Sequence, residues 1–247
     1  MSLARLQTLA RYWRRLYKED SRRALRSMGW LLSKYPLRFA KIRPGHPVSD
    51  IPVFFINLDR RPDRRIRFEE TFGEFQLSDP IRVPGVEHVD PMIGCSLAHH
   101  RALSEALRSG AEVSIIAEDD VMMRCDPANL HAVIAEFSGN RWLDVLCIGN
   151  RVKGLLFSIS ENLAVSNDIQ TASLYVVKRS ALEKLIQSMA ESAEMLALGA
   201  PWKDAAPDTH WKKLQQGTLT FAVPRERCAT QRAGYSDIGR KEVAYDV

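Results

Sequence analysis

The sequence comprises 247 residues, of which 45% are hydrophobic and 26% charged, with a formal net charge of +5. These values are ordinary for a globular protein and exclude a chain disordered throughout, a collagen-like fibre and a disulfide scaffold. The four cysteines lie far apart and form no C-x-x-C pair. This spacing argues against a zinc ribbon or a thioredoxin-like site and favours reduced thiols in a cytosolic compartment.

Residues 1–47 form a basic arm, which we treat as separate from a domain over residues 48–247. The arm holds 12 Lys and Arg against 2 acids, whereas the remaining 200 residues hold 23 basic and 28 acidic side chains. Leu, Trp and Tyr recur in the arm at three- and four-residue spacing with Arg and Lys between them, which predicts an amphipathic helix to about residue 35. Such a helix suits an anionic membrane surface, or docking on the domain with its basic face in water. No stacking motif supports a nucleic-acid partner.

The domain reads as alternating strands and helices. Apolar runs rich in β-branched and aromatic residues predict strands, and helical periodicity with capping residues predicts helices. In chain order we expect a strand over 51–58, a helix over 62–75, a short strand within 79–90, a helix over 95–109, a strand over 113–117, a helix over 127–137, strands over 144–149 and 171–177, and a helix over 180–198. This order predicts an α/β fold of three layers with a mostly parallel central sheet.

Three consecutive acids, Glu118, Asp119 and Asp120, follow the strand over 113–117 directly. Ligands of open α/β sheets bind beyond the carboxyl ends of the strands, which is where this triplet falls. Adjacent carboxylates repel one another, and a hard divalent cation such as Mg²⁺ or Mn²⁺ removes that repulsion. A solvated turn near a helix start is the alternative interpretation.

Basic and polar residues also follow the first strand of the domain. Arg60 and Arg64 belong to an arginine cluster at the start of the helix over 62–75, where guanidinium groups and helix N-terminal amides suit phosphate. Asn57 and Asp59, at the exit of the strand, are candidates to hydrogen-bond a base or a ribose, or to stabilise a turn.

Five segments resemble, in the same order, the sequence blocks of glycosyltransferase family 25, which contains lipooligosaccharide and collagen galactosyltransferases. They are residues 56–65 (INLDRRPDRR), 94–99 (GCSLAH), 115–121 (IIAEDDV), 171–185, and Gln231 with residues 236–238. The resemblance implies a GT-A-type fold and an inverting transfer from a UDP-sugar, usually UDP-galactose, with Mn²⁺. Glu118 and Asp120 match the acidic motif and are the expected metal ligands, with Asp119 beside the nucleotide.

The acceptor side of such a reaction needs a general base that deprotonates the attacking hydroxyl. Asp208 matches the late aspartate block of the family and is our candidate, although it is also placed to cap a helix before Trp211. Asp237 is expected to help close the nucleotide site. His99 matches the family as well, but a lone helical histidine is also consistent with a packed structural residue.

We therefore expect a metal-dependent hexosyltransferase, with galactose the expected sugar and a lipid-linked lipopolysaccharide or lipooligosaccharide glycan the acceptor. No apolar run approaches the ~18–20 residues that span a bilayer, and nothing marks the chain for export. The expected place is the cytoplasmic face of a bacterial inner membrane, with residues 1–35 on the lipid surface. The alternatives are a protein or capsular acceptor, and a catalytically degenerate module that binds a nucleotide-sugar without transferring it.

Overall fold

The computed structural model describes residues 29–30, 32–34, 36, 42–43, 45–236, 238 and 241–243. The chain divides into two compact units, Met1–Ala40 and Lys41–Val247. In the first unit residues 29–30 and 32–34 are helical, and the remainder of the predicted amphipathic helix lies outside the described residues. No helix in the described part of the chain is both long and apolar enough to cross a membrane.

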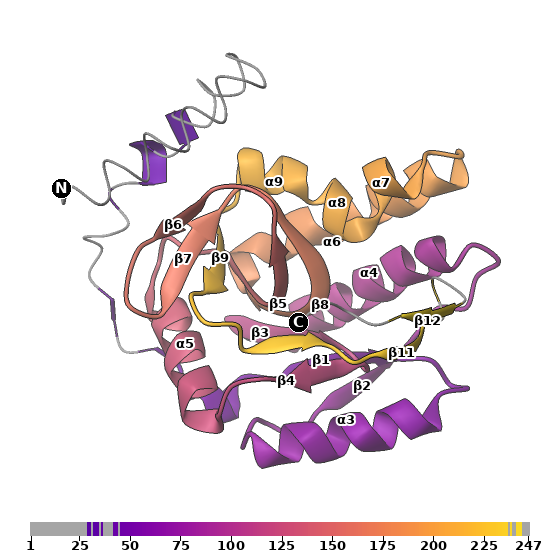
Figure 1. The fold of residues 1–247 in the computed structure, drawn as a ribbon, viewed down its shortest axis with the longest axis horizontal. Helices are drawn as coiled ribbons and strands as arrows, with labels where there is room; N and C mark the ends of the chain where they lie inside the picture. Colours follow the sequence, from indigo (N-terminus) through magenta and orange to yellow (C-terminus); the bar gives the residue numbers. More distant parts are fainter. Residues whose placement is uncertain are drawn as a thin grey trace. The chain divides into compact units, whose positions relative to one another are not determined.

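The second unit is built on a mixed ten-stranded sheet (Figure 1). Its main path runs through β2 (Ile81–Pro84), β1 (Val53–Asn57), β3 (Val113–Glu118), β8 (Ile169–Lys178), β5 (Val145–Val152), β9 (Phe221–Pro224), β7 (Leu163–Ser166) and β6 (Leu156–Ser158), with β10 (Ala229–Gln231) beside β5 and β4 (Val121–Met123) beside β10. A separate ribbon pairs β11 (Gly234–Ser236) with β12 (Lys241–Val243).

Most strands of the large sheet run in one direction, and β4, β7 and β8 run in the other. The expected α/β fold with a mostly parallel central sheet is therefore confirmed. The reversed central strand β8 has a physical cause. No helix separates β5 from β8 in the chain, and a parallel return to the same sheet needs a crossover connection of a dozen or more residues, usually helical.

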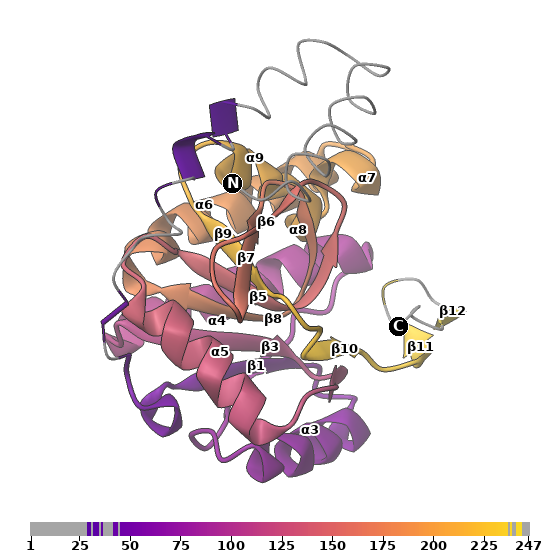
Figure 2. The same ribbon diagram turned by 60° about the vertical axis from the view of Figure 1, so that its left-hand side comes forward.

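Helices cover both faces of the sheet (Figure 2). They are α3 (Pro62–Glu74), α4 (Pro91–Ser109), α5 (Pro127–Gly139), α6 (Arg179–Ala197) and the short α7 (Trp202–Ala205), α8 (Pro207–His210) and α9 (Lys212–Gln216), and a 3-10 turn, η2 (Val48–Asp50), precedes β1.

The two faces are separated by the alternation of side chains along each strand. Phe54 of β1 belongs to the core cluster that also contains Leu103 of α4 and Leu185 of α6. The next residue, Phe55, faces the opposite way and stacks on Phe68 of α3 with ring centroids 4.4 Å apart. The helix α4 thus covers one face of β1, with α6 beside it over β8, and α3 covers the other face of β1.

The largest departure among the predicted helices is the start of α4, which begins four residues earlier than expected. Pro91 occupies the first helical turn, where its missing N–H is not needed, and the Asp90 carboxylate accepts a hydrogen bond from the Met92 N–H at 2.8 Å. This capping places the first turn of α4 beside the ends of β1 and β3. The strands β6, β7 and β9 and the helices α7 to α9 were not predicted, because each is too short to show a periodicity.

Candidate functional site

The carboxyl ends of β1 and β3 meet at one edge of the sheet. The two strands are parallel neighbours in which Ile56 pairs with Glu118, so the acidic triplet begins where β1 also ends. A cavity of about 270 Å³ opens at this edge. Its walls come from the end of β1, the start of α3, the loop before α4, the first turns of α4, the acidic triplet and the C-terminal segment after β10. This is the edge at which open α/β sheets bind their ligands.

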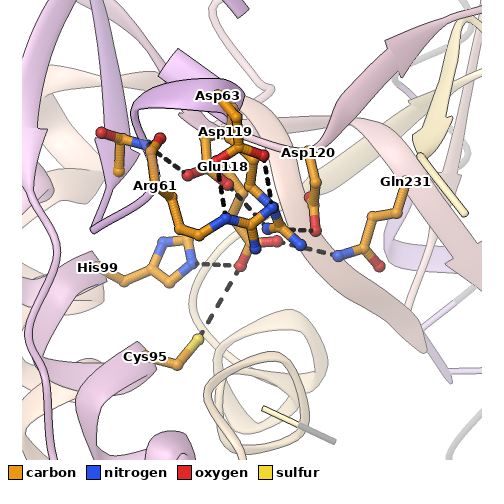
Figure 3. Close-up of polar contacts among 10 residues, drawn as sticks. Arg61, Asp63, Cys95, His99, Glu118, Asp119, Asp120 and Gln231 are labelled. Carbon is orange, nitrogen blue, oxygen red and sulfur yellow. Dashed lines mark hydrogen bonds and ion pairs between the residues drawn. The ribbon is translucent and has the colours of Figure 1, made fainter. Parts of the chain in front are cut away.

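The acidic triplet is divided between the two faces of the sheet. Glu118 lies two residues after Ile116, which belongs to the core cluster beneath α4 and α6, so its side chain is directed to the α4 side. Asn57 lies two residues after Phe55 and is therefore on the α3 side, where it contacts Asp119. Figure 3 shows the resulting arrangement, in which neighbouring acids of one turn contact different helices.

Asp119 is held by the protein through both of its carboxylate oxygens. Asn57 Nδ2 donates to Oδ2 at 2.7 Å, and Arg64 Nη1 donates to Oδ1 at 3.0 Å. Burial raises the pKa of Asp119, and these two partners offset part of that effect. The Asn57 amide is itself fully engaged, because it also donates to Arg61 O at 2.9 Å and accepts from Arg82 Nε at 2.9 Å. Asp119 and Asn57 therefore form a rigid support for the turn.

Asp120 is less completely satisfied than its neighbour. Its Oδ2 receives Arg64 Nη1 at 3.3 Å, but its buried Oδ1 has no hydrogen-bond partner within the described part of the chain. Burial and the adjacent Glu118 charge raise the pKa of Asp120 to about 7, against the opposing effect of Arg64. A buried carboxylate oxygen without a partner is costly and calls for a missing ion or water. Oxygen ligands of this kind fit a hard divalent cation.

Glu118 lies between α4 and β10. His99 Nε2 donates to its Oε1 at 3.1 Å, the Cys95 Sγ lies 3.9 Å from the same oxygen, and Gln231 Nε2 donates to Oε2 at 3.1 Å (Figure 3). The Tyr175 hydroxyl lies 3.2 Å from His99 Nδ1. Since a neutral imidazole has one donor and one acceptor, His99 carries its proton on Nε2 and accepts from Tyr175 when it donates to Glu118.

Arg60 and Asp59, which were also assigned to nucleotide binding, lie at or beyond the rim of the cavity. Arg60 lines the cavity and forms an exposed ion pair with Glu87, 2.8 Å apart. Asp59 pairs with Arg82 and leaves 83% of its side chain exposed. Asp237 lies outside the described residues.

Asp208 lies in the first turn of α8, which begins at Pro207 and has Ala206 at its N-cap. It therefore does not cap a helix, and its Oδ2 instead accepts the backbone N–H of Thr171 at 3.0 Å. Thr171 has a φ of 76°, an uncommon backbone conformation for threonine. Asp208 is not among the residues that line the cavity, although its charge contributes to raising the pKa of the Cys95 thiol.

Several residues of this region had no assigned role from the sequence. Gln231 stands in a segment that carried the family resemblance, and Cys95 and His99 have the four-residue spacing that places two side chains on one helix face. Both features are visible in the sequence and could have identified Gln231, Cys95 and His99 as site residues. Arg82 and Tyr175 reach the site only through the register of β2 and β8 with their neighbours, which no local pattern encodes.

Comparisons with known proteins show similarity of structure but not of sequence. No protein-family model and no curated protein matches this sequence. Among solved structures, the chain is similar to a glycosyltransferase involved in glycosylation of the major capsid of PBCV-1, at 12% identity and a TM-score of 0.49 over 77% of this chain and 96% of that one. It is also similar to a mannose-1-phosphate geranyltransferase from Thermus thermophilus, at 12% identity and a TM-score of 0.40 over 69% of this chain and 58% of that one. Likenesses at this level assign neither an activity nor a substrate.

Proposed function

We propose that this chain is a nucleotide-sugar-dependent glycosyltransferase of GT-A type, which transfers a hexose from a UDP-sugar to a glycan acceptor. The proposal rests on the five sequence segments that resemble glycosyltransferase family 25 and on the chemistry of the cavity at the sheet edge. Galactose as the sugar, and a lipopolysaccharide or lipooligosaccharide glycan as the acceptor, come from the resemblance alone.

The observation that carries the proposal is the buried Oδ1 of Asp120, which has no partner among the described residues. Asp120 would hold a Mg²⁺ or Mn²⁺ ion together with Glu118, whose Oε2 receives only the neutral amide of Gln231 among the contacts described. The ion would supply charge neutralisation of the diphosphate leaving group. Arg64 is already placed between the two aspartates, so its guanidinium contributes positive charge to the same wall of the cavity.

The triplet is pre-organised for this role by residues that do not need to touch the donor. Asn57 and Arg64 fix Asp119, and His99 and Gln231 fix Glu118, so the turn keeps its geometry without a ligand. Arg60 at the rim is placed to meet the nucleotide, and Asp59 is a further candidate there. Groups held in place before binding cost no reorganisation when charge develops on the leaving group.

Asp208 is the proposed general base. In the structure its Oδ2 is occupied by the hydrogen bond from the Thr171 N–H at 3.0 Å. This bond, and the position of Asp208 outside the cavity wall, favour the second candidate function, a nucleotide-sugar-binding module without transfer. A protein or capsular acceptor remains a third possibility that leaves the donor chemistry unchanged.

A donor screen tests the proposal. UDP release from UDP-sugars is measured with and without Mn²⁺, using purified lipooligosaccharide as acceptor, for the wild type, Asp120→Ala and the exposed control Asp79→Ala. We expect Mn²⁺-dependent UDP release in the wild type and the control, and its loss in Asp120→Ala with the fold unchanged by circular dichroism. Unchanged turnover in Asp120→Ala refutes the metal assignment. If the protein binds UDP and Mn²⁺ but neither releases UDP from any UDP-sugar nor transfers the sugar, it is a nucleotide-sugar-binding module.

Attachment of the basic arm to an anionic membrane surface is part of the proposal and needs its own test. Arg43 N donates to Gly139 O at 3.1 Å, so the segment after residue 41 packs on α5 and has to be kept. The truncated variant for this test therefore lacks residues 1–40 and keeps the segment that packs on α5. We expect it to reduce co-sedimentation with anionic liposomes and to spare transfer to a soluble acceptor. Equal sedimentation of the truncated and full chains would show that the arm is not the anchor.

A further inference from the structure

A second group of potential metal ligands lies beside the acidic turn, on the α4 side. Cys95 and His99 are four residues apart on α4 and present their side chains to Glu118 at the end of β3. The ligand atoms of these three residues all lie within 4.8 Å of one another. The group thus combines a thiol, an imidazole and a carboxylate from two well-formed elements (Figure 3).

The spacing of these atoms is close to that of a tetrahedral zinc site. With bond lengths near 2.3 Å for sulfur and 2.0 Å for nitrogen and oxygen, tetrahedral angles give about 3.3 Å between nitrogen and oxygen and about 3.5 Å between sulfur and oxygen. The observed separations are 3.1 Å for His99 Nε2 and Glu118 Oε1, and 3.9 Å for Cys95 Sγ and Glu118 Oε1. The third separation, between the ligand atoms of Cys95 and His99, is no more than 4.8 Å.

We propose that Cys95, His99 and Oε1 of Glu118 bind one thiophilic divalent cation such as Zn²⁺, with its fourth coordination position open to the cavity, which leaves Oε2 of Glu118 for the ion proposed at Asp120. Three protein ligands and one open position are typical of zinc sites that exchange a water or a substrate atom. Cys95 and Glu118 both line the cavity, so a hydrated ion reaches the site from there. Thiolate and imidazole ligands select zinc and cobalt over the Mg²⁺ or Mn²⁺ expected at Asp120.

The charges of the loaded site balance. A divalent cation with the Cys95 thiolate, the Glu118 carboxylate and neutral His99 has no net charge, which suits a largely buried position. The thiol proton is released to the buffer on binding. A coordinated cation deprotonates its thiol ligand outright.

Tyr175 provides the outer support that metal-binding histidines usually have. When Nε2 binds the cation, the imidazole proton moves to Nδ1 and is donated to the Tyr175 hydroxyl, 3.2 Å away. The phenol ring is fully buried and is packed edge-on against Trp211 at 5.5 Å between centroids. Its hydroxyl therefore serves as donor without the cation and as acceptor with it, at one fixed place.

Cobalt substitution tests the site directly and does not depend on the transferase proposal. The full chain, freed of metal by a chelator, is titrated with Co²⁺, and the near-ultraviolet thiolate-to-cobalt charge-transfer band and the visible bands of tetrahedral cobalt are recorded. We expect both with one equivalent of Co²⁺, and displacement of the cobalt by Zn²⁺. Cys95→Ser should lose the charge-transfer band, and Tyr175→Phe should weaken Co²⁺ binding about 10–100-fold.

Cys125→Ser is the matched control, because Cys125 is a partly exposed thiol in the connection between β4 and α5. It should leave the cobalt spectrum unchanged, as should Asp120→Asn, whose expected loss of Mn²⁺-dependent turnover reports separately on the proposed function. The proposal is overturned if the wild type gives no thiolate band, if Cys95→Ser keeps it, or if Cys125→Ser removes it. His99→Gln provides a second ligand variant should Cys95→Ser fail to fold, and an unchanged cobalt affinity in His99→Gln also overturns the proposal.

Discussion

Replacing Arg64 by alanine should destabilise the protein far more than replacing its neighbour Arg65. Arg64 is 15% exposed and is paired with Asp119 and Asp120, which are 9% and 15% exposed. Removing one partner of a buried ion pair leaves a desolvated charge and costs about 3–5 kcal/mol. Arg65 is 50% exposed and pairs with Glu69 one helical turn away, an interaction worth about 0.3–0.5 kcal/mol.

Thermal and urea unfolding of the two variants measure this difference. For a domain of about 200 residues, each 1 kcal/mol shifts Tm by about 2–4 °C, so we expect a loss of about 6–20 °C for Arg64→Ala and of about 1–2 °C for Arg65→Ala. The cost of Arg64→Ala should be larger at pH 8 than at pH 6. Protonation of Asp120, whose pKa is already raised to about 7, removes at low pH the charge that Arg64 compensates.

The same variant also reports on the acidic turn as a cation site. Arg64 is the cation paired with Asp119 and Asp120 among the described ion pairs. In Arg64→Ala a bound divalent cation would have to supply this positive charge, so Mn²⁺ should raise the Tm of the variant more than that of the wild type. Equal losses of stability in Arg64→Ala and Arg65→Ala would refute the view that a buried charge cluster is held here. An absent Mn²⁺ effect in both the variant and the wild type would refute the cation site.

Three further predictions concern other parts of the fold. Gly94→Ala should cost about 1–3 kcal/mol in urea unfolding, because its Cβ would lie 2.4 Å from a backbone carbonyl oxygen of the loop before α4, whereas Gly73→Ala in α3 meets nothing within 4 Å and should stabilise by about 0.5–1 kcal/mol. Burial lowers the pKa of His210 below its usual 6.5, so the unfolding free energy should fall as pH drops through 6.5 until the folded-state pKa is passed, and His210→Gln should flatten this slope. Cys125 accepts a hydrogen bond from Cys228, which lowers the pKa of its thiol, so limited iodoacetamide should label Cys125 first, as read by mass spectrometry.

Each of these has a clear contrary outcome. Equal stabilities of the two glycine variants would mean that the loop before α4 moves aside without cost. An unchanged pH slope in His210→Gln would assign the slope to other groups. If iodoacetamide labelled another cysteine before Cys125, the exposure of Cys125 and the lowered pKa of its thiol would not be what controls the order of labelling.

The main elements of the fold were predictable because their signals are local. The strands β1 and β3 are continuous apolar runs, and α3 and α6 show helical periodicity, so their bounds agree with expectation to within a few residues. The reversal of β8 was not predicted, although the missing helix between β5 and β8 was visible in the sequence. The sequence predicted a mostly parallel sheet without specifying which strands run against the others, and residues 153–168 between β5 and β8 form β6 and β7 instead of a crossover helix.

The acidic triplet shows which part of the site a sequence can specify. Its location beyond a buried strand was predictable, and so was its proximity to the end of β1, because parallel neighbours end at one edge. The strand parity that separates Glu118 from Asp119 was predictable as well, since residues 116 and 118 share a face with period two. The groups that face each acid were not predictable, because they depend on which helix covers which side of the sheet.

Tyr175 illustrates this dependence most clearly. Its hydroxyl reaches His99 because β8 runs antiparallel to β3 and pairs Tyr175 with Ile116, two residues before Glu118 and on the same face. A parallel β8 would have a different register, and the phenol would not reach the imidazole on α4. The Tyr175–His99 contact therefore follows from the antiparallel placement of β8 beside β3. The contacts of Glu118 itself come from Cys95 and His99 of α4 and from Gln231 of β10.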